Sequence, residues 1–361
     1  MKYKVMFFIP SLAGGGAERV FANIINEIDK STFDVTLVYL SDTRNVYKIN
    51  NNVNIINLKS NRLRNSPFKI LASIRRENPD LIITTHGHMN LLLILLKPFI
   101  SNKIKLIVRQ TNILSFNFSI NKIKNRFEKM IFGLLKYSDK IICQSEYMKK
   151  DIMMHLKVNE DKIVKIFNPV AIHEVMDKSK EKVDYTFTDN YKYIIFIGRL
   201  NEVKNIPTII DAFEQYYKKV NSKSKLLILG NGPKENELKQ LINQKNLKDN
   251  VCLLGFQENP YKWLKHSDLF IMASKHEGMP NVLIEALTLE VPVLVQRHPG
   301  GTIDIMEALE ITDKFLDKLV INDKVFSPYK NDVLLKLRKN FGIEKVVKEY
   351  EDLFISMLKE T

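Results

Sequence analysis

The sequence predicts an α/β protein with two domains, each built around a doubly wound parallel sheet. Short, continuous apolar runs alternate with stretches of helical periodicity along the whole chain, which is typical of buried parallel strands joined by crossover helices. A chain of 361 residues is longer than those that usually fold around a single hydrophobic core, so two domains are expected. A polar stretch at residues 171–190 separates two such series of runs, and we expect it to be a linker.

The first domain is expected at residues 1–170, and its first strand is the apolar run Val5–Ile9. Three glycines follow at positions 14–16, before a stretch with apolar residues at helical spacing. A glycine-rich turn between a strand and a helix lets a ligand approach the backbone, and the start of the helix favours phosphate. Gly15 and Gly16 are therefore candidate ligand contacts, although their spacing differs from that of a dinucleotide fingerprint.

Five further runs in this domain have the apolar character of buried strands. They are Asp34–Leu40, Val53–Leu58, Leu81–Thr84, Lys105–Val108 and Lys140–Gln144. In open parallel sheets, ligands bind beyond the carboxyl ends of the strands. His86, His88 and Arg109 stand close after two of these strands and are candidate contacts to a substrate. A histidine at a strand end is otherwise usually an ordinary polar loop residue.

The second domain is expected at residues 191–340, followed by a closing helix at residues 341–361. Its strands are predicted at Tyr193–Ile197, Lys225–Leu229, Asn250–Leu254, Asp268–Met272 and Val291–Gln296. Glycine directly follows three of these strands, at Gly198, Gly230 and Gly255. We expect these turns to face a ligand for the same reason as the glycines of the first domain.

The stretch Ser274–Ala286 follows a buried strand and leads into an apolar helix. Gly278 loosens the turn, and Pro280 suits the first helical position, where its missing N–H costs nothing. The first amides of such a helix are free to bind an anionic or hydroxyl-rich ligand. Glu277 and Glu285 frame this turn and can reach two parts of one ligand. An ordinary strand-to-helix connection with two solvated glutamates has the same local pattern.

This stretch has the pattern S-x-x-E-G-x-P-x-x-x-x-E-A and resembles the signature of the retaining glycosyltransferases of family 4. Two other motifs agree with that resemblance, G-G-A-E-R at residues 15–19 and G-R-L followed by lysine at residues 198–204. The resemblance extends over nearly the whole chain. It implies the GT-B fold, in which two Rossmann-like domains face each other across a cleft and the last helix returns to the first domain.

The resemblance also implies roles for individual residues. Glu285 is expected to hold the ribose hydroxyls of a nucleotide, and Glu277 is expected to contact the donor sugar. Arg199 and Lys204 are expected to offset the charge that develops on the leaving pyrophosphate, so these two cations and Glu277 are the catalytic candidates. The remaining contacts to the donor are expected at Gly15, Gly16, Gly198, Gly230, Phe256, Gly278, Met279, Pro280 and Asn281.

The chain departs from the family pattern in two places. Many relatives have a histidine after the fifth strand of the first domain, where this chain has Val108–Asn112. His86 and His88 are the candidates to replace it, and Arg109 is a candidate contact to an anion of the acceptor or donor. The later glycine turn of the family has the altered sequence Pro299–Asp304.

The net charge of +14 is unevenly distributed. The first 184 residues carry 30 lysines and arginines against 17 acidic residues, whereas the remainder is nearly balanced. Two basic segments, residues 59–76 and 120–140, suit an anionic lipid surface, although a solvated helix face explains either segment alone. We therefore expect the first domain to contact an anionic membrane surface. No zinc-finger spacing, RNA-binding motif or basic tail indicates a nucleic-acid partner.

The sequence predicts a cytoplasmic protein that is bound peripherally to the inner face of the membrane. Met1–Lys4 leads into the first strand without a signal peptide. The longest apolar run, Met89–Ile100, is shorter than the roughly 20 residues that span a bilayer. Cys143 and Cys252 lie far apart without metal-ligand spacing, which fits two reduced thiols.

Together these features predict a retaining hexosyltransferase that acts in the synthesis of a cell-surface polysaccharide or lipopolysaccharide. We expect it to move a hexose or N-acetylhexosamine from a nucleotide-diphosphate sugar, with UDP as the expected nucleotide, to a lipid-linked saccharide. No D-x-D motif occurs, so we expect neither a metal nor another cofactor. Two alternatives remain open, a GT-B epimerase of sugar nucleotides and a non-catalytic protein that binds them.

Overall fold

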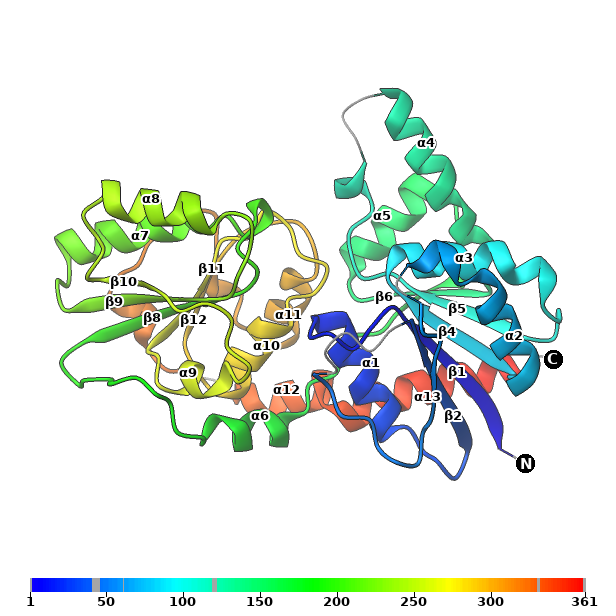
Figure 1. The fold of residues 1–361 in the computed structure, drawn as a ribbon. Coiled ribbons are helices and arrows are strands. Elements are labelled where there is room, and N and C mark those ends of the chain that lie inside the picture. The colour runs from blue at the N-terminus through cyan, green and yellow to red at the C-terminus, as the bar shows by residue number, and fades with distance from the viewer. Residues whose placement is uncertain (1, 41–45, 61, 119–121, 330–331, 360–361) are drawn as a thin grey trace. The chain divides into compact units, whose positions relative to one another are not determined.

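The computed structural model describes residues 2–40, 46–60, 62–118, 122–329 and 332–359, without the side chains of residues 117, 122, 123 and 125–127. The chain forms two compact units, each with its own parallel sheet (Figure 1). The first unit comprises the chain up to Pro169 together with the segment that begins at Ile343. The second unit comprises Val170–Gly342.

Seven parallel strands form the sheet of the first unit, in the order β3-β2-β1-β4-β5-β6-β7. Their bounds are β1 Tyr3–Ile9, β2 Phe33–Tyr39, β3 Asn54–Asn57, β4 Leu81–Thr85, β5 Lys105–Arg109, β6 Lys140–Cys143 and β7 Ile163–Lys165. The strands predicted for this unit are confirmed to within a residue or two. Strand β7 was not predicted, because its three residues are too few to show a pattern.

Helices cover both faces of this sheet. Their bounds are α1 Gly16–Glu27, α2 Pro67–Glu77, α3 Gly87–Leu96, α4 Lys122–Phe132, α5 Glu146–Leu156 and α13 Ile343–Lys359. One hydrophobic core joins the sheet to α2, α3 and α5, and another joins it to α1 and α13. In the second of these cores, the ring of Phe354 lies edge-on to Phe7 and Phe33, with centroids 6.3 and 6.0 Å away. The last helix of the chain therefore packs within the first unit.

Six parallel strands form the sheet of the second unit, in the order β10-β9-β8-β11-β12-β13. Their bounds are β8 Lys192–Ile197, β9 Ser224–Leu229, β10 Val251–Leu253, β11 Leu269–Met272, β12 Val293–Gln296 and β13 Phe315–Leu316. The predicted strands of this unit are confirmed, whereas β13 has only two residues and no pattern of its own. Since neighbouring strands are parallel in both sheets, the predicted doubly wound α/β class is confirmed.

The helices of the second unit return the chain between these strands. Their bounds are α6 Ile172–Ser179, α7 Ile206–Lys219, α8 Glu235–Gln244, α9 Tyr261–Lys265, α10 Asn281–Thr288, α11 Thr302–Ala308 and α12 Val333–Phe341. Among the helices of both units that the structure describes, none combines the length and the apolar content needed to cross a bilayer.

The stretch 171–190, expected to be a linker, is part of the second unit. It begins with α6, whose Ile172 and Val175 are buried and which packs against α9 and α10. Further along, the ring of Tyr185 packs on Trp263, with centroids 5.5 Å apart. These few apolar side chains anchor the segment to the second unit. Because the rest of the segment is polar, its composition predicted a linker.

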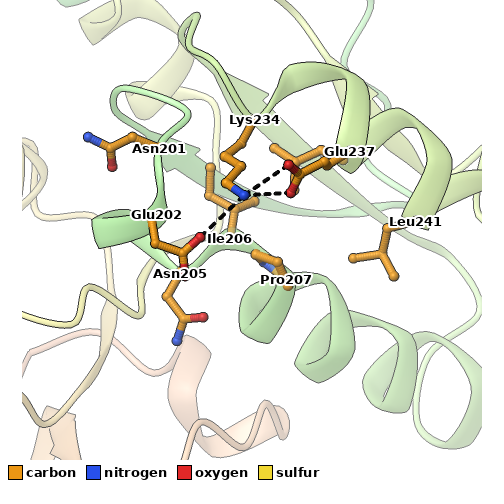
Figure 2. Close-up of a pocket in the computed structure, with 9 residues that line it drawn as sticks. Asn201, Glu202, Asn205, Ile206, Pro207, Lys234, Glu237 and Leu241 are labelled. Carbon is orange, nitrogen blue, oxygen red and sulfur yellow. Dashed lines mark hydrogen bonds and ion pairs between the residues drawn. The ribbon is translucent and has the colours of Figure 1, made fainter.

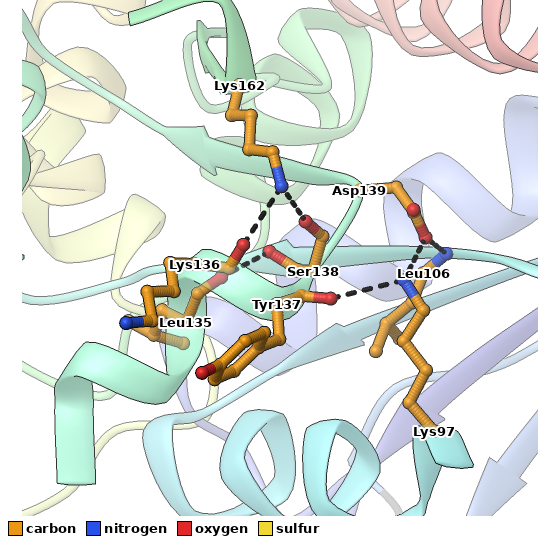
Figure 3. A network of polar contacts seen from close by, with 8 residues as sticks. All are labelled: Lys97, Leu106, Leu135, Lys136, Tyr137, Ser138, Asp139 and Lys162. Carbon is orange, nitrogen blue, oxygen red and sulfur yellow. Dashed lines mark hydrogen bonds and ion pairs between the residues drawn. The ribbon is translucent and has the colours of Figure 1, made fainter. Parts of the chain in front are cut away.

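A network of polar contacts closes the amino edge of the first sheet, where β5 and β6 begin (Figure 3). Lys97 Nζ donates to the carboxylate of Asp139 at 2.7 Å. Lys162 Nζ donates to the carbonyl oxygen of Lys136 at 2.9 Å, within the short 3-10 helix η4, Gly133–Tyr137. These contacts hold η4 against the sheet, so this edge has a structural role. The loops of interest for function lie at the opposite, carboxyl edge.

Candidate functional site

Two glycine turns press against each other at the carboxyl ends of β8 and β9. Gly230 has a positive φ of 130°, and a Cβ atom at this position would lie 2.0 Å from the carbonyl oxygen of Gly198. Any other residue at position 230 would therefore collide with the backbone. Gly230 N also donates to Gly255 O at 2.7 Å, and Phe256 follows with half of its surface exposed. The structure thus brings together the glycines predicted at the ends of these strands.

The loop after Gly198 carries the two predicted cations. Asn201 accepts a hydrogen bond from Lys204 N at 3.2 Å, which closes the single 3-10 turn η6, Glu202–Lys204. From this turn, Lys204 Nζ reaches to 2.5 Å from Glu277 Oε1. Arg199 is exposed, so its guanidinium is accessible to a ligand.

Glu277 is held at the centre of this group of turns. Its Oε1 accepts hydrogen bonds from Lys204 Nζ and from Ser274 Oγ, the latter at 2.6 Å, and only 15% of its side chain is accessible. Burial alone would raise the pKa of Glu277. The charge of Lys204 and the hydrogen bonds from Lys204 and Ser274 outweigh burial, so the pKa of Glu277 lies below its usual value. Glu277 is therefore an ionised hydrogen-bond acceptor at neutral pH.

The glycine turn after β12 lies against the Glu277 turn. Glu277 N donates to Pro299 O at 3.2 Å, and Gly301 N lies 3.0 Å from the carbonyl oxygens of both Glu277 and Gly278. The altered sequence Pro299–Asp304 therefore still builds a second wall beside Glu277.

His298 stands directly before that turn and was not identified from the sequence. It is buried, donates from Nδ1 to Gln296 O at 2.7 Å and accepts at Nε2 from Thr302 Oγ1 at 2.8 Å. Burial lowers the pKa of His298, and the neutral ring satisfies both hydrogen bonds. His298 thus supports the glycine turn, and its only signal in the sequence is its position before Pro-Gly-Gly.

Helix α10 begins one residue later than predicted. Pro280 has an extended ψ of 100° and precedes the helix, whereas we expected it at the first helical position. Met279 and Glu285 are buried, while Gly278 and Asn281 remain partly exposed. The turn therefore presents its backbone at Gly278 and Asn281 to a ligand, and Glu285 lies deeper within the same helix.

A pocket of about 280 Å³ adjoins the η6 turn in the second unit (Figure 2). Its lining residues are Asn201, Glu202, Asn205, Ile206, Pro207, Lys234, Glu237, Leu238 and Leu241. On its rim, Lys234 Nζ lies 3.4 Å from Glu202 Oε2 and 2.8 Å from Glu237 Oε2. These ion pairs tie η6 to α8 and so help to hold Lys204 in place. The residues predicted to contact a ligand are not among those that line this pocket.

In the first unit, the predicted glycine loop and one predicted histidine come together through Glu18. Gly15 directly precedes α1, and Glu18 folds back over it so closely that a Cβ atom on Gly15 would lie 2.1 Å from Glu18 Oε2. His86 Nε2 lies 3.4 Å from Glu18 Oε1. Burial would raise the pKa of Glu18, but the hydrogen bond and charge of His86 lower it below its usual value. Gly16 begins α1, and His88 is exposed in the first turn of α3.

Glu18 was not chosen from the sequence, although its signal was present. It is the acidic residue of the G-G-A-E-R motif at residues 15–19. A charged side chain in the first turn of a helix is usually explained by the helix dipole alone. Only the position of His86 after β4 shows that the carboxylate has a specific partner.

Arg109 is buried in the core of the first unit. Only 1% of it is exposed, its Nε donates to the hydroxyl of Tyr350 at 3.2 Å, and its Nη2 donates to Asn168 Oδ1. We expected this arginine to meet an anion of the acceptor or donor. Its side chain instead lies on the face of the sheet that α13 covers, where it joins β5 to the last helix. These contacts satisfy Nε and Nη2, whereas the buried Nη1 has no hydrogen-bond partner among the described residues.

Each unit therefore carries its own group of candidate residues. In the second unit, Lys204 contacts Glu277 beside the glycine turns, and in the first unit Gly15 and His86 lie against Glu18. Within the ranges that the structure describes, no cluster of histidine, cysteine and carboxylate side chains is arranged to hold a metal ion.

Two family models match this chain. The model "Glycosyltransferase Family 4" matches residues 14–174, and the model "Glycosyl transferases group 1" matches residues 177–334. The two matches are consecutive and together include both groups of candidate residues.

Individual proteins agree with these matches. An uncharacterized glycosyltransferase of Methanocaldococcus jannaschii is 37% identical over 273 residues, which are 73% of this chain and 64% of that protein. The N-acetylgalactosamine-N,N'-diacetylbacillosaminyl-diphospho-undecaprenol 4-alpha-N-acetylgalactosaminyltransferase of Campylobacter jejuni is 29% identical over 308 residues, 82% of each chain. The match thus spans less than two thirds of the first relative but most of the second.

A solved structure has the same fold. The crystal structure of HepE from Anabaena, in complex with UDP and glucose, superposes with a TM-score of 0.74 over 98% of this chain and 100% of that chain. The two sequences are 15% identical, so this likeness concerns the fold alone.

Proposed function

The chain belongs to the family 4 glycosyltransferases, which have the GT-B fold, and we propose that it is a retaining hexosyltransferase with a lipid-linked saccharide as its acceptor. The donor is a nucleotide-diphosphate hexose or N-acetylhexosamine, linked to UDP. The name of the Campylobacter relative, with its diphospho-undecaprenol acceptor, supports the class of acceptor. The UDP and glucose bound to HepE support the class of donor. The role of the enzyme is then in the synthesis of a cell-surface polysaccharide.

The observation that carries this proposal is the ion pair between Lys204 and Glu277. It sets an ammonium group and an ionised carboxylate side by side, next to the closely packed glycine turns at Gly198 and Gly230. A carboxylate held in this state accepts hydrogen bonds from sugar hydroxyls. The ammonium keeps two further N–H groups for the diphosphate. This arrangement suits a ligand that is polyhydroxylated at one end and anionic beside it.

The reaction requires no nucleophile from the protein. The bond between the anomeric carbon and the β-phosphate oxygen breaks, and the acceptor hydroxyl forms its bond to the same carbon on the same face. The departing phosphate oxygen takes the proton of that hydroxyl. Arg199 and Lys204 offset the negative charge that grows on the phosphate, because preorganised cations stabilise charge that develops in the transition state. No metal ion is needed for that role.

The other residues bind and orient the donor. Glu285 holds the ribose hydroxyls, and the partly exposed backbone of Gly278 and Asn281 contacts the sugar. The glycine turns around Gly230, with Phe256 beside them, receive the nucleotide. In the first unit, Gly15 and Gly16 are contacts to the donor, and His86 and His88 serve the acceptor side. A lipid-linked acceptor brings the enzyme to the inner face of the membrane, with the basic first domain toward the lipid.

The test begins with calorimetric titration of the purified protein with UDP and a panel of UDP-sugars, with and without a chelator. Binding of one UDP-sugar that the chelator does not change is the expected result. The preferred donor is then incubated with polyprenyl-diphosphate saccharides, and the anomeric configuration of the product is determined by NMR. An inverted product would refute retention, and strict dependence on added metal would refute a metal-independent mechanism. UDP release without an acceptor would favour an epimerase, and binding without any turnover would favour a binding protein.

A further inference from the structure

We propose that the first unit docks on an anionic lipid bilayer through a surface around the start of α2, with Phe68 inserted between the lipid head groups. This docking surface consists of Lys59, Arg62, Arg64, Phe68 and Lys69. The inference rests on the proposed function, because a lipid-linked acceptor requires that the enzyme work at a membrane. It assigns that contact to one side chain and its basic neighbours.

Phe68 is the most exposed large apolar side chain among the described residues. Its exposed fraction is 87%, although it lies in the first turn of a regular helix whose other face is buried in the core through Ile70 and Ile74. A single exposed apolar side chain is common on protein surfaces and needs no explanation by itself. Two features distinguish Phe68 from other exposed apolar side chains. The turn that precedes it is held by hydrogen bonds, and the segment around it in the sequence is basic.

The turn that precedes Phe68, between Ser60 and Ser66, is held by hydrogen bonds of two buried serines. Ser66 Oγ donates to Ser60 Oγ at 2.8 Å, and both serines are buried. Ser60 Oγ in turn donates to the carbonyl oxygen of Arg62 at 3.1 Å, and Ser66 Oγ lies 3.2 Å from the same oxygen. Lys69 Nζ donates to the carbonyl oxygen of Leu58 at 2.9 Å. Phe68 is therefore displayed by an ordered turn.

The charge along the segment that contains Phe68 has one sign. Residues 59–76 contain six lysines and arginines and no acidic residue. All six are exposed, and they are Lys59, Arg62, Arg64, Lys69, Arg75 and Arg76. Arg76, near the end of α2, pairs with Glu77. An aromatic ring among cations matches the boundary between anionic head groups and acyl chains, where the ring enters the apolar layer and the cations bind the head groups.

The docking surface lies at the edge of the sheet where the candidate site lies. Leu58 N donates to Tyr39 O at 2.9 Å, and Ser60 N donates to Leu40 O at 2.7 Å, so this segment, which follows β3, lies beside the carboxyl end of β2. Tyr39 pairs with Ile9, the last residue of β1, and the glycine loop follows directly. Docking here therefore brings the lipid surface to the side from which His86 would meet a lipid-linked acceptor.

A second exposed apolar group lies at the opposite, amino edge of the same sheet, and it provides a matched control. Leu95, Phe99 and Tyr137 are all more than half exposed there. The lysine between the first two, Lys97, is neutralised by the carboxylate of Asp139 (Figure 3). Docking through this edge would turn the glycine loop away from the lipid.

The experiment measures co-sedimentation of the full chain with vesicles of phosphatidylcholine alone and with added phosphatidylglycerol, without donor or acceptor. We expect Phe68→Ser to lower the partition coefficient on anionic vesicles about tenfold, since it removes a buried aromatic ring from the interface. Arg62→Gln and Arg64→Gln should each lower it about fivefold. Phe99→Ser should leave it unchanged, and wild-type binding should weaken with salt.

Thermal unfolding confirms that each variant is folded. Turnover with a water-soluble acceptor analogue should be the same in Phe68→Ser and wild type, whereas turnover with the acceptor in anionic vesicles should fall. Loss of vesicle binding in Phe99→Ser but not in Phe68→Ser would overturn the proposal in favour of the other edge. Equal binding to neutral vesicles, or none to anionic ones, would also overturn it. If the protein docks through Phe68 but transfers no sugar, the proposed function fails and the docking surface stands.

Discussion

Lys204 and Glu277 lie 73 positions apart in the chain and form an ion pair of 2.5 Å that joins the loop after β8 to the turn before α10. Neither side chain is more than one fifth exposed. The pair therefore fixes the relative position of two loops that the sheet alone would leave independent. It also places a permanent positive charge and a permanent negative charge side by side, in the part of the second unit richest in glycine turns.

Removal of Lys204 tests the role of that positive charge. In Lys204→Met we expect kcat/KM to fall at least hundredfold, or about 2.7 kcal/mol, because the leaving phosphate loses its nearest cation. Initial rates of UDP release measure the effect. Lys218→Met is the control, since Lys218 is half exposed and pairs with Glu214 within α7, outside the site. Equal losses in the two variants would assign the effect to general electrostatics.

The acid limb of the pH–rate profile should report Glu277. Its pKa in the folded protein lies below the usual value of 4.5, so the ionised form and the stability it contributes are fully present above that value. Both are lost as the pH falls through the lowered pKa. We expect kcat/KM of the wild type to be insensitive to this group from neutral pH down to about 5. In Ser274→Ala one hydrogen bond to the carboxylate is missing, and the acid limb should move to higher pH. An unmoved limb would separate Glu277 from the reaction.

Glu285 and Arg199 should matter for the donor in different ways. We expect Glu285→Ala to weaken UDP binding and Arg199→Ala to lower turnover, each by tenfold to hundredfold or about 1.4–2.7 kcal/mol. Calorimetry with UDP and initial rates with the UDP-sugar distinguish binding from chemistry. Lys223→Ala, an exposed cation just before β9, is a control that should change neither quantity. A folded variant with unchanged binding and turnover would remove that residue from the site.

Gly230 should tolerate no side chain. In Gly230→Ala the added Cβ would meet the carbonyl oxygen of Gly198 at 2.0 Å, and the positive φ adds strain. We expect loss of UDP binding and a destabilisation of about 1–3 kcal/mol in chemical unfolding. Gly133→Ala is the control, because a Cβ there meets nothing within 4 Å. Normal UDP binding by Gly230→Ala would show that the two turns can separate at little cost.

Tyr350→Phe tests whether Arg109 has a structural role. The substitution leaves Arg109 Nε buried without its acceptor, and we expect a destabilisation of about 1–3 kcal/mol in urea unfolding. UDP binding should be unchanged, since both residues belong to the first unit. Tyr137→Phe, at an exposed tyrosine, should have no effect on stability. If Tyr350→Phe were stable but inactive with acceptor, Arg109 would again be a candidate substrate contact.

The fold was largely predictable because continuous apolar runs such as Val5–Ile9 allow few alternatives to a buried parallel strand. The elements that escaped prediction, β7 and β13, are too short for periodicity and gain their hydrogen bonds only from neighbouring strands. Helix α6 escaped because a few apolar anchors in a polar stretch are recognisable only beside the helices they meet.

The parts of the candidate site that lie within one turn could be predicted from the sequence. The parts that depend on contacts between distant segments of the chain could not. The glycine at position 230 and the turn around Glu277 are local requirements, and the motifs identified them. The position of Arg109 depends on which helix covers its face of the sheet, and that helix comes from the far end of the chain. The pairing of Glu18 with His86 likewise joins two loops that no spacing in the sequence connects.

The return of α13 to the first unit has a consequence for how the protein is made. The first unit is discontinuous in the chain, while the second lies wholly within Val170–Gly342. A ribosome therefore completes the second unit while the first still lacks the helix that covers Phe7 and Phe33. Until the last residues emerge, that face of the nascent sheet stays open to chaperones or to other chains. The unit that begins first in synthesis is the one that finishes folding last.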